Sequence, residues 1–428
     1  MMIRSRMQWS LAKKGPASTG RKSLLRTAVL GLTGLVVILA VAGCDDAVAT
    51  KTPRPTKVPK ATPTPVATPT PVPTLRVTPV PSSGLGAVGA LTDGRLGQTA
   101  TLLDDGRVLL AGGKDALGRA LNTAEVYDPR TALFTATLTM YQPRADHAAA
   151  KLKDGRVLIV GGAGNSAEIF DPSGNTFSLT GPMTTARSGA TATTLADGRV
   201  LVAGGTGTST APLNTAELFD PKTDKFTKTG SMTVGRALHT ATLLTNGSVL
   251  ITGGGSGTAQ LASAESYNPA TGKFKGTSGS MHSARAGASA ILLPNGQVLV
   301  AGGFKNTSSG TAFRAKTTST YLATAETFNP KTGKFTSVHG MATAREFPAL
   351  ALLQNGNVLV VAGLGKGFLP LSTMELYTTS KGWFTPAGAL SKLRAFASAT
   401  TLQDGSVLIA GGWAGGTVAL DSAERYTP

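Results

Sequence analysis

The chain of 428 residues contains a single cysteine, Cys44, which excludes an internal disulfide and a cysteine-rich zinc site. Charged residues make up only 15% of the sequence, and no segment shows the apolar heptads of a coiled coil. The four histidines are scattered, and no His, Cys or carboxylate cluster has metal-ligand spacing. The sequence therefore predicts neither a metal centre nor a bound cofactor.

Basic residues exceed acidic ones by 18, but this excess is unevenly distributed. Residues 1–26 contain seven Lys or Arg and no acid, and residues 45–82 contain five Lys or Arg against two Asp. The rest of the chain carries 29 basic and 21 acidic residues without basic runs. A dilute excess of this kind does not predict binding to nucleic acid.

Glycine is abundant, with 53 residues, and much of it belongs to a repeated stretch. The stretch reads DGRVLLAGG at 105–113 and recurs six times, starting at positions 154, 197, 246, 295, 355 and 404. A strand followed by Gly-Gly can begin a phosphate-binding loop. The segment that follows, KDALGRALNTAEVYDP, has no Gly-Lys-Ser/Thr and no helical periodicity, so we interpret the stretch as a structural repeat.

Two charged residues recur in register with every copy. An arginine lies ten positions before the Asp or Asn of each stretch: Arg95, Arg144, Arg187, Arg236, Arg285, Arg345 and Arg394. A glutamate with an aromatic residue two positions later follows each stretch: Glu125, Glu168, Glu217, Glu265, Glu326, Glu375 and Glu424. An active site is a local asymmetry, so seven equivalent charges are assigned to the fold. Each arginine is expected to bind that glutamate or nearby loop carbonyls.

Successive arginines are separated by 49, 43, 49, 49, 60 and 49 residues. This period and the Gly-Gly strand end resemble the kelch repeats of bacterial kelch and galactose-oxidase-like central domains, which read R…DGRVLVAGG…AE.YDP.T..F. The resemblance implies an all-β fold over residues 83–428, a seven-bladed β-propeller of four-stranded kelch-type blades. The copper centre of galactose oxidase, with its Tyr-Cys crosslink, does not transfer, because Cys44 lies outside this region.

Each unit is expected to contain strands a to d. Asp-Gly or Asn-Gly joins strands a and b, which predicts a type I′ hairpin turn. Strand d is expected to begin at a Phe seven residues after the strand c aromatic, but the seventh unit ends before such a Phe. Leu85 and Leu91 have the same spacing as Phe134 and Met140. We therefore predict that the N-terminal segment is the missing strand and closes the last blade.

The first 82 residues predict export and anchoring. A basic leader and an apolar run end at Val41-Ala42-Gly43-Cys44, which resembles the lipobox of bacterial lipoproteins. The resemblance implies a signal peptide over 1–43, cleavage before Cys44 and attachment of lipid to its sulfur. An uncleaved signal anchor is the alternative. The segment 44–82 is rich in Pro and Thr and is expected to be an extended polyproline II linker.

The repeats differ most between strands b and c. The glutamate follows Gly-Gly by 11 or 12 positions in five units, by 6 in the second and by 23 in the fifth, where residues 304–325 form an insertion. Exposed aromatics beside cations suit stacking on sugars or capture of a peptide. A mobile polar flap is the alternative interpretation of the insertion. In propellers, the b–c and d–a loops share one face, and the insertion is expected to overhang the channel mouth there. The candidate ligand-binding residues of this face are Tyr141, Phe313, Arg314, Lys316, Tyr321, Phe368 and Trp413.

Two functions fit these features. The first is a monomeric binding module that is held at the bacterial cell membrane by an N-terminal lipid, outside the cytoplasm, and presents its loop face to a glycan or protein. The alternative is a carbohydrate-active kelch-propeller enzyme, oxidase-like or epimerase-like, without the copper-radical site. An enzyme would need a catalytic constellation unique to one blade. The non-repeated acids predicted near the loop face are Asp115, Asp146, Glu346 and Asp421.

Overall fold

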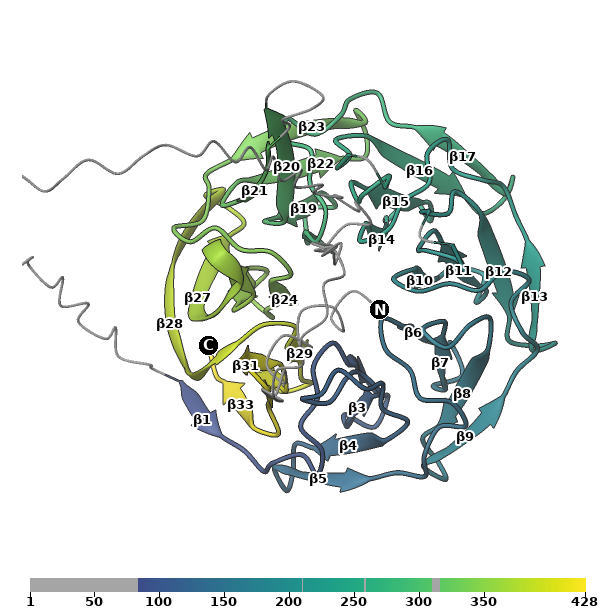
Figure 1. Cartoon of the computed structure of the whole chain (residues 1–428), viewed down its shortest axis with the longest axis vertical. Helices are drawn as coiled ribbons and strands as arrows, with labels where there is room; N and C mark the ends of the chain where they lie inside the picture. The colour runs from purple at the N-terminus through teal and green to yellow at the C-terminus, as the bar shows by residue number, and fades with distance from the viewer. Residues whose placement is uncertain (1–83, 210, 258, 310–315) are drawn as a thin grey trace, which may run out of the picture.

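The structure is a computed structural model that describes residues 84–428 except 210, 258 and 310–315 (Figure 1). The predicted signal peptide, Cys44 and the linker lie outside the described residues, so these assignments stay predictions. The described chain forms a seven-bladed β-propeller in which each blade has four antiparallel strands, and the sixth blade has the short strand β26 (Leu364–Gly365) as a fifth. No helix within these residues is long and apolar enough to cross a bilayer.

Within each blade the strands are ordered from the central axis to the outside of the ring as a, b, c and d (Figure 1). The innermost strands a are β2 (Thr99–Leu102), β6 (Ala148–Lys151), β10 (Thr191–Thr194), β14 (Thr240–Leu243), β18 (Ser289–Leu292), β24 (Ala349–Leu352) and β29 (Ser398–Thr401). Strands b are β3 (Val108–Ala111), β7 (Val157–Val160), β11 (Val200–Ala203), β15 (Val249–Thr252), β19 (Val298–Ala301), β25 (Val358–Val361) and β30 (Val407–Ala410).

Strands c and d complete the blades. Strands c are β4 (Ala124–Asp128), β8 (Ala167–Asp171), β12 (Ala216–Asp220), β16 (Ala264–Asn268), β22 (Ala325–Asn329), β27 (Leu369–Thr378) and β33 (Ala423–Tyr426). The outermost strands d are β5 (Leu133–Ala136), β9 (Thr176–Leu179), β13 (Lys225–Lys228), β17 (Lys273–Gly276), β23 (Lys334–Val338), β28 (Trp383–Arg394) and β1 (Leu85–Ala87).

The hydrophobic core lies between neighbouring blades. Every residue of the seven b strands is buried, which explains their continuous apolar runs, because a strand covered on both faces has no solvent side. In the first interface, Leu109 and Val126 of blade 1 pack with Ile159 and Phe170 of blade 2. Seven clusters of this kind, one for each pair of neighbouring blades, follow one another around the closed ring.

The N-terminal strand closes the ring, as the sequence predicted. β1 pairs antiparallel with β33, and Leu85 lies opposite Tyr426 just as Phe134 lies opposite Tyr127 in blade 1. Leu91 is 4% exposed and belongs to the core cluster between the last and first blades. The seventh sheet thus consists of three C-terminal strands and one N-terminal strand, which covers the outer edge of β33.

The predicted type I′ turns are wrong in detail, although the a–b hairpins are present. In blade 1 the amide of Leu103 donates to Arg107 and that of Gly106 donates to Leu103, which makes a three-residue loop. Gly106 has a φ of 88°, but Asp105 is not among the residues with positive φ. The aspartate instead accepts the Arg107 amide at 3.0 Å. This is a type I turn followed by a left-handed glycine, an alternative that Asp-Gly also permits.

Candidate functional site

The b–c and d–a connections meet at one face of the ring, which we call the loop face; the short a–b and c–d turns lie at the other. At the loop face, each of the seven arginines forms an ion pair with the strand c glutamate of its unit, at 2.7–3.1 Å. The arginine side chains are 0–1% exposed. The same arrangement in all seven units supports a structural role for these charges.

One copy shows how the arginine connects the strands. Arg144 donates to Glu168 Oε1 at 2.9 Å and to the carbonyl oxygens of Gly161 and Ser166, both at 2.9 Å. Glu168 also accepts the backbone amides of Tyr141 and Gln142, at 2.8 and 3.1 Å. The pair therefore links the d–a connection, the end of strand b and the start of strand c, and satisfies groups that burial would otherwise leave unpaired.

A cavity of about 380 Å³ lies on the central axis. It is lined by Ala, Ser, Thr, Pro and Leu residues of the inner strands, with no ionisable side chain: Ala100, Thr240, Ala241, Ala288, Ser289, Ala290, Pro348, Ala349, Leu350, Ser398 and Ala399. The hydroxyls are used within the protein, since Ser289 donates to Pro348 O at 2.6 Å and Ser398 to Ala410 O at 3.4 Å. The channel wall thus offers a neutral surface to a ligand.

The seven residues that lie two positions after the repeated arginines form a rim around the loop-face end of this channel. All seven rim residues have a left-handed backbone, with φ between 50° and 65°. Three are glycine, which adopts this conformation freely, whereas the other four pay a cost of about 1 kcal/mol each. The rim residues in order are Gly97, Asp146, Gly189, Leu238, Gly287, Phe347 and Phe396.

Two rim phenylalanines from adjacent blades contact each other at the channel mouth. The ring centroids of Phe347 and Phe396 are 5.2 Å apart at an interplanar angle of 43°, and both side chains are half-buried. A Cβ at Gly287 would lie 3.0 Å from the ring of Phe347, so a larger residue at position 287 would crowd this ring. Our sequence analysis missed both phenylalanines. The sequence did contain a signal: the residue two positions after the arginine is, in the seven units in order, G, D, G, L, G, F and F, so the last two units differ from the others.

The predicted insertion is a raised hairpin on blade 5, with β20 (Phe304–Ser309) paired to β21 (Lys316–Tyr321). The structure brings Tyr321 against Phe368, with ring centroids 5.8 Å apart and nearly perpendicular. Phe313 and Arg314 lie outside the described residues. Lys316 is placed by its backbone as the first residue of β21. The two aromatic candidates that meet therefore belong to blades 5 and 6.

The other two aromatic candidates lie elsewhere on the face. Trp413 begins the hairpin of β31 (Trp413–Gly415) and β32 (Val418–Ala419) on blade 7, and its indole N–H donates to Gly416 O at 3.0 Å. Tyr141 is 60% exposed on the connection between blades 1 and 2. No ring contact among the described residues joins either of them to the Tyr321–Phe368 pair.

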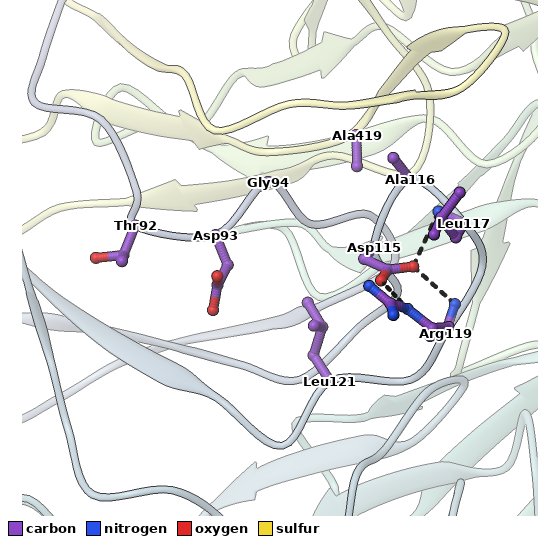
Figure 2. Close-up of a pocket in the computed structure, with 9 residues that line it drawn as sticks. All are labelled: Thr92, Asp93, Gly94, Asp115, Ala116, Leu117, Arg119, Leu121 and Ala419. Carbon is purple, nitrogen blue, oxygen red and sulfur yellow. Dashed lines mark hydrogen bonds and ion pairs between the residues drawn. The ribbon is translucent and has the colours of Figure 1, made fainter.

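A second pocket, of about 360 Å³, lies at the seam between the last and first blades (Figure 2). Asp115 accepts the backbone amides of Leu117 and Arg119 and an Arg119 guanidinium N–H, so it holds its own loop. Asp93 accepts the hydroxyl of Thr123 at 2.7 Å. The carboxylates of this pocket thus stabilise the local connections.

The remaining non-repeated acids are dispersed. Asp146 accepts from Lys114 at 2.8 Å, Glu346 is 1% exposed, and Asp421 is exposed. Asp115 and Asp146 each pair with a basic side chain, Arg119 and Lys114 respectively.

Two histidines occupy the same position of the repeat and contact threonines of the inner strands. His147 and His239 are 8% and 7% exposed, and their Nε2 atoms lie 3.0 Å from the hydroxyls of Thr99 and Thr191 in the preceding blades. Burial, followed by the charge of the adjacent arginine, lowers the pKa of His147 to about 4 and that of His239 to about 3. Both imidazoles are therefore neutral in the folded protein at neutral pH.

Replacing His147 and His239 with Gln is expected to reduce the loss of stability in acid. The unfolded chain takes up protons on these residues below about pH 6.5, while the folded protein does not until about pH 4, so stability falls as the pH falls through this window, by about 3 kcal/mol per histidine. Gln98 occupies the same position in blade 1 and donates to Ala410 O at 2.8 Å. Denaturant unfolding at pH 7 and pH 4.5 measures the difference.

The control for this experiment is His339→Gln, because His339 is exposed. It is expected to leave the pH dependence of unfolding unchanged. A double variant, His147→Gln with His239→Gln, that loses as much stability in acid as the unmodified protein would contradict the assignment.

Comparison with known proteins agrees with this geometry. The sequence model of the kelch motif matches residues 95–136 and 186–233, which fall within units that the structure shows as four-stranded blades. The chain is a kelch-repeat β-propeller. No curated protein matches the sequence of this kelch propeller.

Solved structures share the fold of the kelch propeller. One is a fungal alcohol oxidase with catalytic diversity among the AA5 family, in complex with copper, with a TM-score of 0.66 and 17% sequence identity over 81% of this chain and 76% of that chain. At this identity the likeness is one of fold. The kelch propeller's own residues do not fit a copper centre: no group of three His, Cys, Asp or Glu side chains lies together in the described part.

Proposed function

We propose that this kelch propeller is a monomeric, membrane-anchored binding module outside the cytoplasm, and that its loop face binds a glycan or protein ligand at the channel mouth. The observation that carries the proposal is the Phe347–Phe396 pair, half-buried above a neutral channel. Aromatic rings in this setting offer a flat apolar surface for a sugar ring or an apolar side chain.

The left-handed backbone at Phe347 and Phe396 supports a binding role for their rings. Glycine occupies three of the seven equivalent positions and would relieve the left-handed strain at Phe347 and Phe396. Strain that a simple substitution would remove is a common property of binding sites. The Tyr321–Phe368 pair and the half-exposed Lys305 stand beside this mouth on blades 5 and 6 and extend the candidate surface.

The test is a screen of residues 84–428 against glycans and cell-surface proteins, followed by the same screen with Phe347→Gly and Phe396→Gly. The double variant is expected to lose at least about tenfold in affinity for any ligand found, while relief of the left-handed backbone offsets part of the stability that is lost with the two rings. Trp383→Ser, at a c–d turn on the other face, is the control and is expected to bind normally. Full binding by the double variant contradicts the proposed site, and turnover of a sugar without added partners favours the enzyme alternative.

Anchoring is tested separately in the full chain. The apolar run that ends at Cys44 supports lipidation of this residue. Cys44→Ser is expected to move the protein from the membrane fraction to the soluble fraction, as measured by fractionation and immunoblotting. Membrane association that persists in Cys44→Ser supports the uncleaved signal anchor instead.

A further inference from the structure

The loop face is raised on one side of the ring. Blade 5 carries the β20–β21 hairpin, blade 6 extends through β26 (Leu364–Gly365) and the long strands β27 and β28, and blade 7 carries the β31–β32 hairpin. In blade 2, by contrast, the glutamate follows Gly-Gly by only six positions. The raised sector of blades 6 and 7 is continuous, because β31 contacts both β27 and β28.

Three aliphatic side chains are exposed at the tips of this sector. Leu369 is 66% exposed, Leu393 47% and Val418 48%. Leu369 precedes Pro370, whose Cγ lies 3.9 Å from the Cβ position of Gly415, and Gly415 pairs with Val418. Leu393 lies on β28, where the next residue, Arg394, pairs with Leu371 of β27. The three side chains therefore lie on neighbouring strands, and we call them the tip patch.

Two exposed lysines flank the tip patch. Lys366 lies three residues before Leu369 in the 3-10 turn η2 (Lys366–Phe368), and Lys392 directly precedes Leu393. Among the described residues, neither lysine forms an ion pair with an acid. The acid nearest in sequence to the patch is Asp421, three residues after Val418. The sector therefore combines exposed aliphatic groups with positive charge.

We propose that the tip patch docks on an anionic lipid surface. Aliphatic side chains that enter the acyl boundary, next to lysines that meet anionic headgroups, match the chemistry of this interface. The proposal rests on the proposed anchoring for its location: about forty residues separate Cys44 from β1, so at about 3 Å per residue the linker is long enough for the ring to turn its loop face toward the membrane. The tips touch first, and the low side over blade 2 stays open to a ligand.

Co-sedimentation of residues 84–428 with vesicles tests the proposal without the anchor. Binding is expected to phosphatidylcholine vesicles with about 30 mol% phosphatidylglycerol, and about tenfold less to phosphatidylcholine alone. Leu369→Ser with Leu393→Ser, and Lys366→Gln with Lys392→Gln, are each expected to reduce binding by at least about fivefold. The matched control is Leu133→Ser with Leu179→Ser, two leucines of the outer strands that are 58% and 56% exposed.

Tryptophan quenching determines the orientation. Residues 84–428 contain two tryptophans: Trp413 in the raised sector and Trp383 at the other face. With brominated lipids, Trp383→Phe, which leaves Trp413, is expected to show quenching and a blue shift, whereas Trp413→Phe, which leaves Trp383, is expected to show neither. Three results would overturn the proposal. They are equal quenching of the two tryptophans, no binding to vesicles, and binding that depends on the lysines alone and extends to a soluble polyanion. Fractionation of Cys44→Ser that also carries Leu369→Ser and Leu393→Ser reports on anchoring independently of the tip patch.

Discussion

A chain that begins at residue 92 instead of residue 83 is expected to unfold at a melting temperature lower by roughly 8 °C. The deletion removes β1, which covers the edge of β33, and the buried Leu91 together with the partly buried Leu85 and Val88. Loss of these three side chains corresponds to about 6 kcal/mol of unfolding free energy. Exposure of β33, with free N–H and C=O groups, is also expected to promote aggregation.

Calorimetry of the two chains measures this difference. The chain that starts at residue 83 lacks the linker but keeps β1, so it controls for the loss of the preceding residues. A synthetic peptide of residues 83–95 added to the shorter chain is expected to raise its melting temperature in proportion to the logarithm of the peptide concentration. Equal melting temperatures for the two chains would show that β1 does not stabilise the ring.

Arg144→Met is expected to lower the free energy of unfolding by about 3–5 kcal/mol. Arg144 and Glu168 are both 0% exposed, so the substitution leaves a buried carboxylate without its counter-charge. It also leaves the carbonyl oxygen of Gly161 without its donor, and that of Ser166 with the Gly161 amide alone. Burial lowers the pKa of Arg144, which nevertheless stays protonated because an arginine in a protein does not lose its proton near neutral pH.

Urea unfolding compares this variant with Arg156→Met in the same blade. The Arg156–Asp154 pair is 30% and 48% exposed, and its loss is expected to cost less than about 1 kcal/mol. In Arg144→Met with Glu168→Met, part of the loss is expected to return, because no buried charge is then unpaired. Similar costs for Arg144→Met and Arg156→Met would mean that the buried pairs do not hold the blades.

The repeat explains why so much of the fold was predictable. Seven copies of one pattern locate each strand, and the spacing of Leu85 and Leu91 shows which segment completes the last blade. The pairing of Arg144 with Glu168 follows from the same register, because both residues belong to one unit and lie where two strands end. The turn type was not predictable from Asp-Gly, since that dipeptide suits two hairpin loops and the strand register selects between them.

The sequence by itself determined the number of blades, the closing strand and the charged pairs of this kelch propeller, because these depend on spacing within a unit. Only the tertiary structure decided which side chains meet at the channel mouth. Phe347 and Phe396 are 49 residues apart, and their contact depends on closure of the ring and on a left-handed backbone at both. The tip patch likewise joins separate hairpins of blades 6 and 7. The repeat shows that Phe347 and Phe396 occupy equivalent positions in two units. Only the packing of neighbouring blades shows that their rings meet.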